Sequence, residues 1–146
     1  MNRMRKKEKA QVWILSKHEG NWKVLLLKLI PERGAYWQPV TGGVEEGESP
    51  KQGALREAWE ETGLDPFRAI RPLQYEFEYE SRWGKVHEEA FFFETLPDCP
   101  EPKTDPIEHT GFQWVDLIDI EKHLVHQSHL QAIARLKELF QKENLL

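Results

Sequence analysis

The sequence predicts an α/β fold in a single domain, and three observations lead to this prediction. The chain has 146 residues, the size of one ordinary domain with its own core. Apolar runs of strand length are mixed with two segments that carry helix signals. A period-two alternation of aromatic and acidic residues indicates a long hairpin with one solvent-facing side. Strands mixed with two main helices are typical of an α/β sandwich rather than a doubly wound sheet.

The chain starts with a basic segment, residues 1–9, that we expect to be a flexible arm preceding the fold. It lacks the apolar core of a secretory signal. Two apolar runs then predict strands over residues 11–16 and 22–30, joined by a turn as a hairpin. Residues 31–36 are expected to be a loop. Residues 37–48, with three glycines, are expected to be an irregular loop holding short extended pieces.

A helix is predicted from Pro50 to Thr62. Ser49 supplies the hydroxyl of an N-cap, and proline suits the first helical position. Gly63 can end the helix in a left-handed conformation. Pro66 prevents the helix from resuming.

The second half of the chain predicts a hairpin, a strand and a second helix. The hairpin turns at residues 83–84, and aromatic residues alternate with glutamates along its first strand. After a proline-rich loop, residues 111–117 predict the last strand and residues 116–124 a short helix or turn. Residues 128–143 form a clear amphipathic helix.

The composition narrows the class of protein. Hydrophobic residues make up 39% and charged residues 31%, which is typical of a soluble globular chain. No apolar run is long enough to span a bilayer, so we expect no membrane partner. The net charge of −5 argues against nucleic acid as a general partner. The single cysteine, Cys99, cannot form an internal disulfide, which is consistent with a reducing, cytoplasmic location.

The acidic stretch REAWEE, residues 56–61, is the feature that most needs an explanation. On a helix, Glu57, Glu60 and Glu61 share one face and repel each other by a few tenths of a kcal/mol per pair. The helix dipole also disfavours anions in this half of the helix. A bound divalent cation would reverse both effects, because carboxylate oxygens are preferred ligands of Mg²⁺ and Mn²⁺. The alternative is a solvated acidic face with an Arg56–Glu60 ion pair.

The other helix positions nearby are expected to face the core. They are Ala54, Leu55, Ala58 and Trp59.

Three histidines near the last helix, His123, His126 and His129, are spaced by three residues. Their spacing straddles the expected helix start, so they need not share a face. We expect a structural or solvent-facing role for them rather than a metal site.

The stretch GGVEEGESPKQGALREAWEETGL, residues 42–64, resembles the Nudix box. Every fixed glycine, glutamate and arginine of that pattern is matched, and one aliphatic position holds the small Ala58. A match of this length is highly specific. The resemblance implies the Nudix α/β/α sandwich, with a mixed central sheet between the helix that contains Gly53 and the C-terminal helix.

The resemblance also implies a Mg²⁺ site, with Mn²⁺ as an alternative ion. The implied metal ligands are the Gly42 carbonyl and the carboxylates of Glu57, Glu60 and Glu61. Arg56 is expected to orient carboxylates such as Glu48 and Glu45. A glutamate would take a proton from the attacking water, and Glu60 is favoured over Glu57 and Glu108.

Two segments outside the box resemble the branch of the family that cleaves dihydroneopterin triphosphate and, in some accounts, dATP. One is WQPVTGGVEEGE and the other is DPIEHTGFQWVDL. The second implies that Glu108 is an additional metal ligand. The expected substrate contacts are Trp37, Thr41, Lys28, Arg33 and His109. Core packing is the alternative for Trp37, and ordinary surface positions are the alternative for the others.

The resemblance implies a metal-dependent pyrophosphohydrolase that converts dihydroneopterin triphosphate or a (d)NTP to a monophosphate and pyrophosphate. The alternatives are hydrolysis of dinucleoside polyphosphates, nucleotide sugars or RNA 5′ ends, or a non-catalytic nucleotide-binding module. Because members of the family often form homodimers, a second copy of the chain is a candidate partner.

Overall fold

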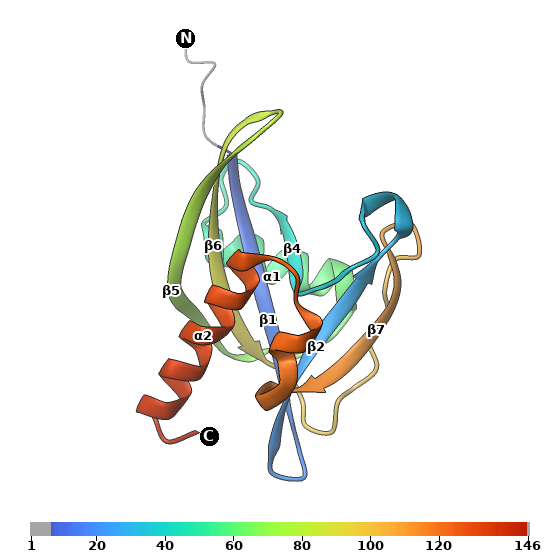
Figure 1. Ribbon diagram of the computed structural model, residues 1–146, viewed down its shortest axis with the longest axis vertical. Coiled ribbons are helices and arrows are strands. Elements are labelled where there is room, and N and C mark those ends of the chain that lie inside the picture. The colour runs from blue at the N-terminus through green and yellow to red at the C-terminus, as the bar shows by residue number, and fades with distance from the viewer. Residues whose placement is uncertain (1–6, 146) are drawn as a thin grey trace.

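The structure is a computed structural model and describes residues 7–145. Its strands are β1 (Lys7–His18), β2 (Asn21–Leu29), β3 (Trp37–Gln38), β4 (Val40–Gly43), β5 (Arg68–Ser81), β6 (Gly84–Glu94) and β7 (His109–Asp116). Its helices are α1 (Pro50–Thr62) and α2 (Gln127–Lys142), with 3₁₀ turns at Pro31–Arg33 and Leu117–His123. Figure 1 shows these elements along the chain.

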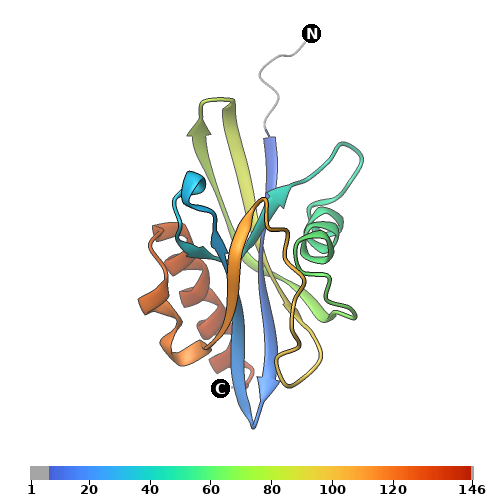
Figure 2. The same ribbon diagram turned by 90° about the vertical axis from the view of Figure 1, so that its right-hand side faces the viewer.

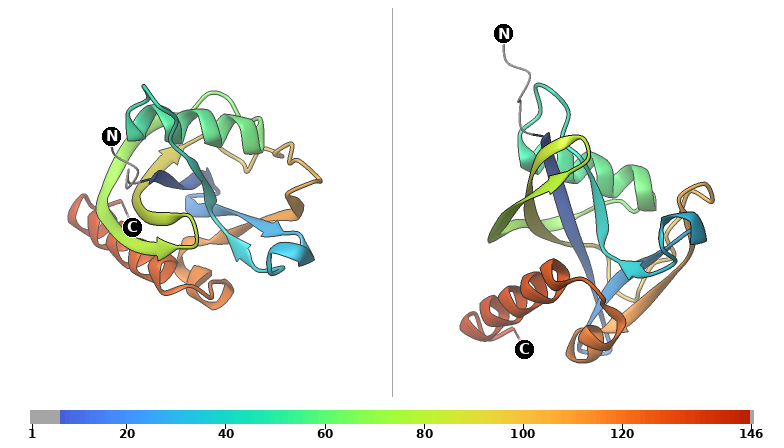
Figure 3. Two further views of the ribbon diagram at one scale, coloured as in Figure 1. Left: turned by 90° about the horizontal axis from the view of Figure 1, so that it is seen from above. Right: turned by 45° about the horizontal axis from the view of Figure 1, so that its top comes forward.

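The architecture confirms the predicted α/β/α sandwich with a mixed sheet. In Figure 2 the sheet stands between α1 on one side and α2 on the other. The strand order is β3-β2-β1-β6-β5, and β4 pairs with β1 while β7 pairs with β2. The β1–β6 pair is parallel and the other pairs are antiparallel. Seen from above, the sheet curves strongly between the two helices (Figure 3).

The middle of the central strand β1 is buried on both faces, which fits the unbroken apolar run at residues 12–15. Val12 and Ile14 belong to the core cluster beneath α1, whereas Trp13 and Leu15 belong to the cluster beneath α2. This alternation follows from the period of two along a strand. Side chains of one strand thus reach both sides of the sheet.

Helix α1 has the predicted ends. The Ser49 hydroxyl accepts a hydrogen bond from the Gln52 backbone N–H at 3.1 Å, and the Gln52 side chain accepts one from the Ser49 backbone N–H at 2.8 Å. This reciprocal capping box satisfies two backbone donors at the helix start. Gly63 adopts a left-handed φ of 66° and ends the helix.

The buried face of α1 differs from the one expected. Ala54 and Ala58 are fully buried as predicted, but Leu55 and Trp59 are 41% and 58% exposed. Glu61 lies on the buried side instead, with 7% of its surface exposed. The helix therefore presents a carboxylate, rather than a large apolar group, towards the interior.

The predicted flexible arm, residues 1–9, is wrong for residues 7–9. Residues 7–9 belong to β1 and pair in register with residues 86–88 of β6. The remainder of the predicted arm, residues 1–6, lies outside the described residues. The expected irregular loop over residues 37–48 contains β3 and β4, which both join the sheet.

Within residues 7–145, neither helix combines the length and apolar character needed to cross a membrane.

Candidate active site

An acidic pocket lies where α1, β4 and the loop before β7 meet. Its volume is about 390 Å³. The acidic side chains that line it are Glu57, Glu60, Glu61, Asp105 and Glu108, and the basic ones are Lys9 and Arg33. Thr41, Gly42 and Gly43 of strand β4 complete the wall of the pocket. The five implied metal ligands thus lie around one pocket, although they come from three separate parts of the sequence.

Among the acidic residues of this pocket, Glu61 has the carboxyl group that is hardest to ionise. Burial raises the pKa of its carboxyl group to about 9, and the nearby carboxylates of Glu57 and Glu108 add to the shift. Burial also raises the pKa of Glu57. Loss of hydration and like-charge repulsion both oppose the ionised forms. A cation bound among these groups would favour the ionised forms, which is what a metal site requires.

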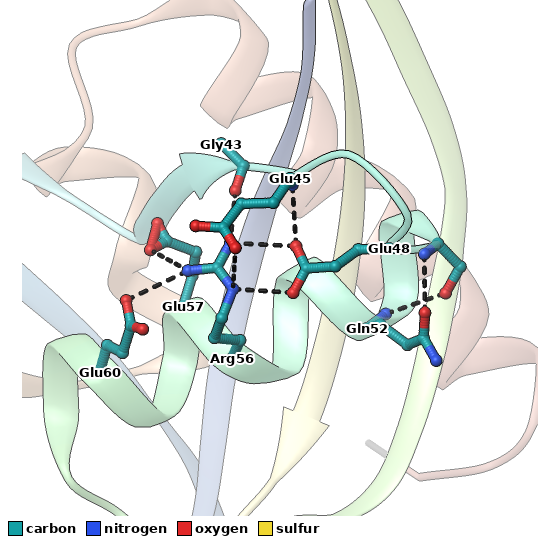
Figure 4. Close-up of polar contacts among 8 residues, drawn as sticks. Gly43, Glu45, Glu48, Gln52, Arg56, Glu57 and Glu60 are labelled. Atoms are coloured by element: carbon teal, nitrogen blue, oxygen red, sulfur yellow. Dashed lines mark hydrogen bonds and ion pairs between the residues drawn. The ribbon is translucent and has the colours of Figure 1, made fainter.

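Arg56 holds the surrounding glutamates in place, as Figure 4 shows. Its Nε donates to Glu48 Oε2 at 2.8 Å, and Nη2 donates to Glu48 Oε1 at 3.1 Å and to the Gly43 carbonyl at 2.8 Å. Its Nη1 donates to Glu57 at 3.2 Å and to Glu60 at 3.1 Å. All five guanidinium N–H groups therefore have partners. The bidentate bond with Glu48 lowers the pKa of that carboxyl group.

Gly42 has a steric reason to be glycine. A Cβ at this position would lie 1.5 Å from Glu57 Oε2 and 2.1 Å from its carboxyl carbon. The Glu57 carboxylate therefore packs directly against the backbone of β4. This contact brings a backbone carbonyl and a carboxylate from α1 to the same place.

The donor set fits a hard divalent cation such as Mg²⁺, because it consists of carboxylate and carbonyl oxygens only. Among residues 7–145, however, no three acidic, histidine or cysteine side chains already converge closely enough to hold an ion. Arg56 accounts for part of this, since it binds Oε1 of both Glu57 and Glu60. Metal binding would require these carboxylates to turn within the pocket.

The predicted substrate residues fall into two groups. Thr41 and Arg33 line the acidic pocket, and Arg33 Nη1 lies 3.6 Å from Glu108 Oε1. Trp37 and Lys28 do not line it. Trp37 packs against the core cluster beneath α2. The Nζ atom of Lys28 lies 5.7 Å from the centre of the Trp37 ring. For Trp37, the structure thus supports the core-packing alternative.

His109 is placed differently from its predicted role in substrate binding. It is 3% exposed and does not line the pocket; its Nε2 lies 3.8 Å from Glu61 Oε1. Burial lowers its pKa, so the neutral ring is favoured. Its Nδ1 has no hydrogen-bond partner among the described residues. His109 therefore lies against Glu61 and outside the lining of the acidic pocket.

Two charged residues of the pocket, Lys9 and Asp105, were not predicted. Lys9 reaches the pocket because β1 starts earlier than its apolar pattern indicates. Asp105 lies three residues before Glu108 in the same loop. A second acidic residue so close to a predicted metal ligand could have indicated that Asp105 belongs to the site. No pattern in the neighbouring sequence predicts that Lys9 reaches the pocket.

A larger hollow of about 790 Å³ lies between the β4–α1 loop and the tip of the β5–β6 hairpin. Its acids include Glu45 and Glu48, which already form ion pairs with Arg56, and none of the three α1 glutamates lines it. The acidic pocket is therefore the better candidate for metal chemistry.

Known sequences include a family model and several relatives that match this chain. The NUDIX domain model matches residues 6–136. An octanoyltransferase of Myxococcus xanthus is 34% identical over 119 residues, covering 77% of this chain and 32% of that protein. An RNA pyrophosphohydrolase of Bartonella henselae is 29% identical over 112 residues, covering 60% of this chain and 65% of that protein. The chain thus spans about a third of the first relative and slightly under two thirds of the second.

Solved structures share the fold. The Ap4A hydrolase of C. elegans, in a binary complex, superposes with a TM-score of 0.77 at 20% identity, over 93% of this chain and 98% of that one. The dihydroneopterin triphosphate pyrophosphohydrolase of E. coli has a TM-score of 0.71 at 26% identity, over 86% and 91% of the two chains. The family model covers most of the sequence, including the α1 glutamates and Gly42, and this chain therefore belongs to the NUDIX family.

Proposed function

We propose that the protein is a Mg²⁺-dependent pyrophosphohydrolase, with Mn²⁺ as an alternative ion. Its substrate would be dihydroneopterin triphosphate or a (d)NTP, cleaved to a monophosphate and pyrophosphate. The observation that carries this proposal is the acidic pocket, in which five carboxylates face two cations, Lys9 and Arg33. The carboxylates suit a metal ion, and the cations suit phosphate oxygens.

The roles of the residues follow from their positions. A bound divalent cation would supply positive charge to the phosphate oxygens and make water a better nucleophile at neutral pH. Glu57, Glu60, Glu61 and the Gly42 carbonyl would hold it, with Glu108 as a further ligand from across the pocket. Lys9 and Arg33, which line the same pocket, would bind phosphate oxygens. Arg56 would set the orientation of Glu57 and Glu60.

We propose Glu60 as the group that takes a proton from the attacking water. Its side chain is 48% exposed, compared with 15% for Glu57 and 9% for Glu61, so Glu60 meets solvent most directly. A base must lie within hydrogen-bond reach of the water that it activates. Glu57 and Glu108 remain the alternatives, because both line the same pocket.

A substrate panel tests the proposal. The purified protein is incubated with Mg²⁺ and with dihydroneopterin triphosphate, the (d)NTPs, Ap4A, ADP-ribose or 5′-triphosphorylated RNA. Pyrophosphate, phosphate and the nucleotide products are then measured separately, because cleavage of Ap4A or ADP-ribose releases nucleotides but neither pyrophosphate nor phosphate. We expect pyrophosphate release from the triphosphates, and EDTA should abolish it.

Other results of this panel would identify a different function. Ap4A and RNA are included because similar proteins carry names that refer to those substrates. Preferential turnover of Ap4A, ADP-ribose or RNA would contradict the proposed substrate class. Tight binding of nucleotides without any turnover would instead indicate a non-catalytic module.

A further inference from the structure

A third pocket, of about 450 Å³, opens on the α2 side of the sheet and has the size of a small-molecule site. It shares Lys9 and Thr41 with the acidic pocket, so the two are neighbours. In Figure 1, strands β5 and β6 continue well beyond the N-terminal end of α2. The pocket lies at the N-terminal end of α2, which contributes Ser128 and His129 to its lining. We call it the ring pocket below.

The walls of the ring pocket are largely aromatic. They include Tyr36, Phe77, Tyr79 and His126. The rings of Phe77 and Tyr79 are inclined by only 26°, with centroids 5.8 Å apart, and Tyr36 meets His126 edge-on at 4.5 Å. Flat aromatic surfaces of this kind suit a planar heterocycle.

A buried carboxylate, Glu88, also lines the ring pocket. Glu88 is 5% exposed and pairs in register with Lys9 on the next strand. Its Oε2 accepts a hydrogen bond from Gln11 Nε2 at 2.9 Å, and its Oε1 accepts one from the Tyr79 hydroxyl at 3.1 Å. The Gln11 amide is oriented in turn by a bond from the Trp13 indole N–H at 2.8 Å. The side chain is therefore held rigidly.

The hydrogen-bonding capacity of Glu88 is only half used. Each carboxylate oxygen can accept two hydrogen bonds, and each has one protein donor. Among residues 7–145, no lysine or arginine forms an ion pair with this carboxylate. A buried carboxylate without a cation is costly unless donors satisfy it. The remaining positions are open to donors from a ligand.

His129 supplies a second unsatisfied group in the same pocket. It is 5% exposed, and its Nδ1 has no hydrogen-bond partner among the described residues. Burial lowers its pKa to about 4, with a smaller contribution from His126, so the ring is neutral at pH 7. The structural or solvent-facing role expected for His126 and His129 is thus incomplete, because both line the ring pocket.

The chemistry of Glu88 selects among heterocycles. A carboxylate is an acceptor only, and two oxygens match two adjacent N–H donors. Guanine and pterin both present this pattern, a ring N–H beside an exocyclic amino group. Adenine and cytosine place a donor beside an acceptor, and uracil and thymine have a single donor between two acceptors. An acceptor facing Glu88 would leave both groups unpaired and cost binding.

We propose that the ring pocket binds the 2-amino-4-oxo edge of a guanine or pterin ring, with Glu88 accepting from its ring N–H and its amino group. This proposal rests on the triphosphate hydrolysis proposed above, since Lys9 and Thr41 connect the ring pocket with the acidic pocket. The heterocycle would lie on the α2 side of the sheet and the phosphates beside α1.

The test compares GTP, ITP and ATP as substrates for the wild-type protein and the variant Glu88→Gln. ITP lacks only the 2-amino group. We expect kcat/KM of the wild type to be at least about tenfold higher for GTP than for ATP, and about tenfold higher for GTP than for ITP. Glu88→Gln should remove the difference between GTP and ITP, because its amide cannot accept both donors. Dihydroneopterin triphosphate is tested in parallel, and its turnover should fall in the variant by a similar factor if pterin is the natural ring.

Glu89→Gln is the matched control. Strand alternation places Glu89 on the other face of β6, and it lines none of the pockets described above. This variant should keep the wild-type preference. A wild type that prefers ATP or pyrimidine triphosphates would overturn the proposal, as would a Glu88→Gln variant that loses GTP and ATP turnover equally.

A binding measurement separates this proposal from the proposed function. The β,γ-imido analogues of GTP and ATP resist cleavage, and their Kd values in Mg²⁺ do not depend on turnover. At least about tenfold tighter binding of the GTP analogue, lost in Glu88→Gln, supports the ring pocket even if the substrate panel shows no hydrolysis. Equal binding of the two analogues by the wild type would exclude it even if hydrolysis is observed.

Discussion

Replacing Glu61 by glutamine is expected to lower kcat/KM by about 10³-fold while leaving the fold intact. The amide keeps the shape of the side chain but removes a negative charge from the metal site, and charge stabilisation by a bound metal ion contributes several kcal/mol to such reactions. Steady-state hydrolysis of the best substrate in Mg²⁺ measures the effect. Glu101→Gln, at an exposed loop position, is the control and should behave like the wild type. Activity of Glu61→Gln within threefold of the wild type would remove Glu61 from the site.

The same substitution should stabilise the metal-free protein above pH 7. Burial raises the folded-state pKa of Glu61 from 4.5 to about 9. Between these values the folded state holds more protons than the unfolded state, so a rise in pH favours unfolding. We therefore expect the wild type in EDTA to lose on the order of 2 kcal/mol of stability between pH 5 and pH 8, because relaxation of neighbouring carboxylates reduces the full value of the shift. Urea denaturation at both pH values should show a much smaller loss for Glu61→Gln.

Replacing Gly42 by alanine is expected to lower kcat/KM by at least about 100-fold. The new Cβ would lie 1.5 Å from Glu57 Oε2, so the carboxylate must leave its position against β4. Because the displaced atoms belong to a side chain rather than to the backbone, we expect a loss of only about 1–2 kcal/mol in stability. Kinetics and thermal unfolding of the same preparation separate the two effects.

Gly43→Ala provides the matched control for this change. A Cβ at Gly43 meets nothing within 4 Å, and its backbone conformation is not left-handed. We expect kcat/KM of this variant to remain within about threefold of the wild type. Equal losses in the two alanine variants would show that the loop, and not the contact between Gly42 and Glu57, is what matters.

The parts of the fold that depend on local signals could be predicted from the sequence. Ser49, Pro50 and Gly63 set the ends of α1 through capping and backbone conformation alone. The hairpin of β5 and β6 follows from period-two alternation, and its aromatic residues face the α2 side as one stripe. The α1 glutamates were recognisable because they match the Nudix box, whereas their helical spacing alone also fits a solvated acidic face.

The features that depend on long-range pairing could not be predicted. Lys9 sits in a basic segment with no strand pattern, and its pairing with Glu88 on β6 and Gly43 on β4 places it beside both pockets. His109 follows a predicted metal ligand directly, but the start of β7 turns its ring behind Glu61. The direction of a side chain at a strand end depends on tertiary packing rather than on its neighbours in sequence.

The exposure of Trp59 and the burial of Glu61 have one cause. The face of α1 that packs on the sheet is lined by Ala54 and Ala58, which bring the helix close to β1 and β4. A large indole does not fit at that distance, whereas the carboxylate at the edge of this face reaches the pocket. Hydrophobicity alone predicts the opposite arrangement.

The central claim is that a divalent cation makes the buried acidic pocket favourable. The most direct test is the thermal unfolding midpoint, Tm, of the wild type and of Glu61→Gln, each measured in EDTA and in Mg²⁺ at pH 8. With Mg²⁺ at about one hundred times its Kd, the wild-type Tm should rise by roughly 5 °C or more, and the Tm of Glu61→Gln should rise by less than about 1 °C. A wild-type Tm that is the same in EDTA and in Mg²⁺, or an equal rise in both proteins, would contradict the account.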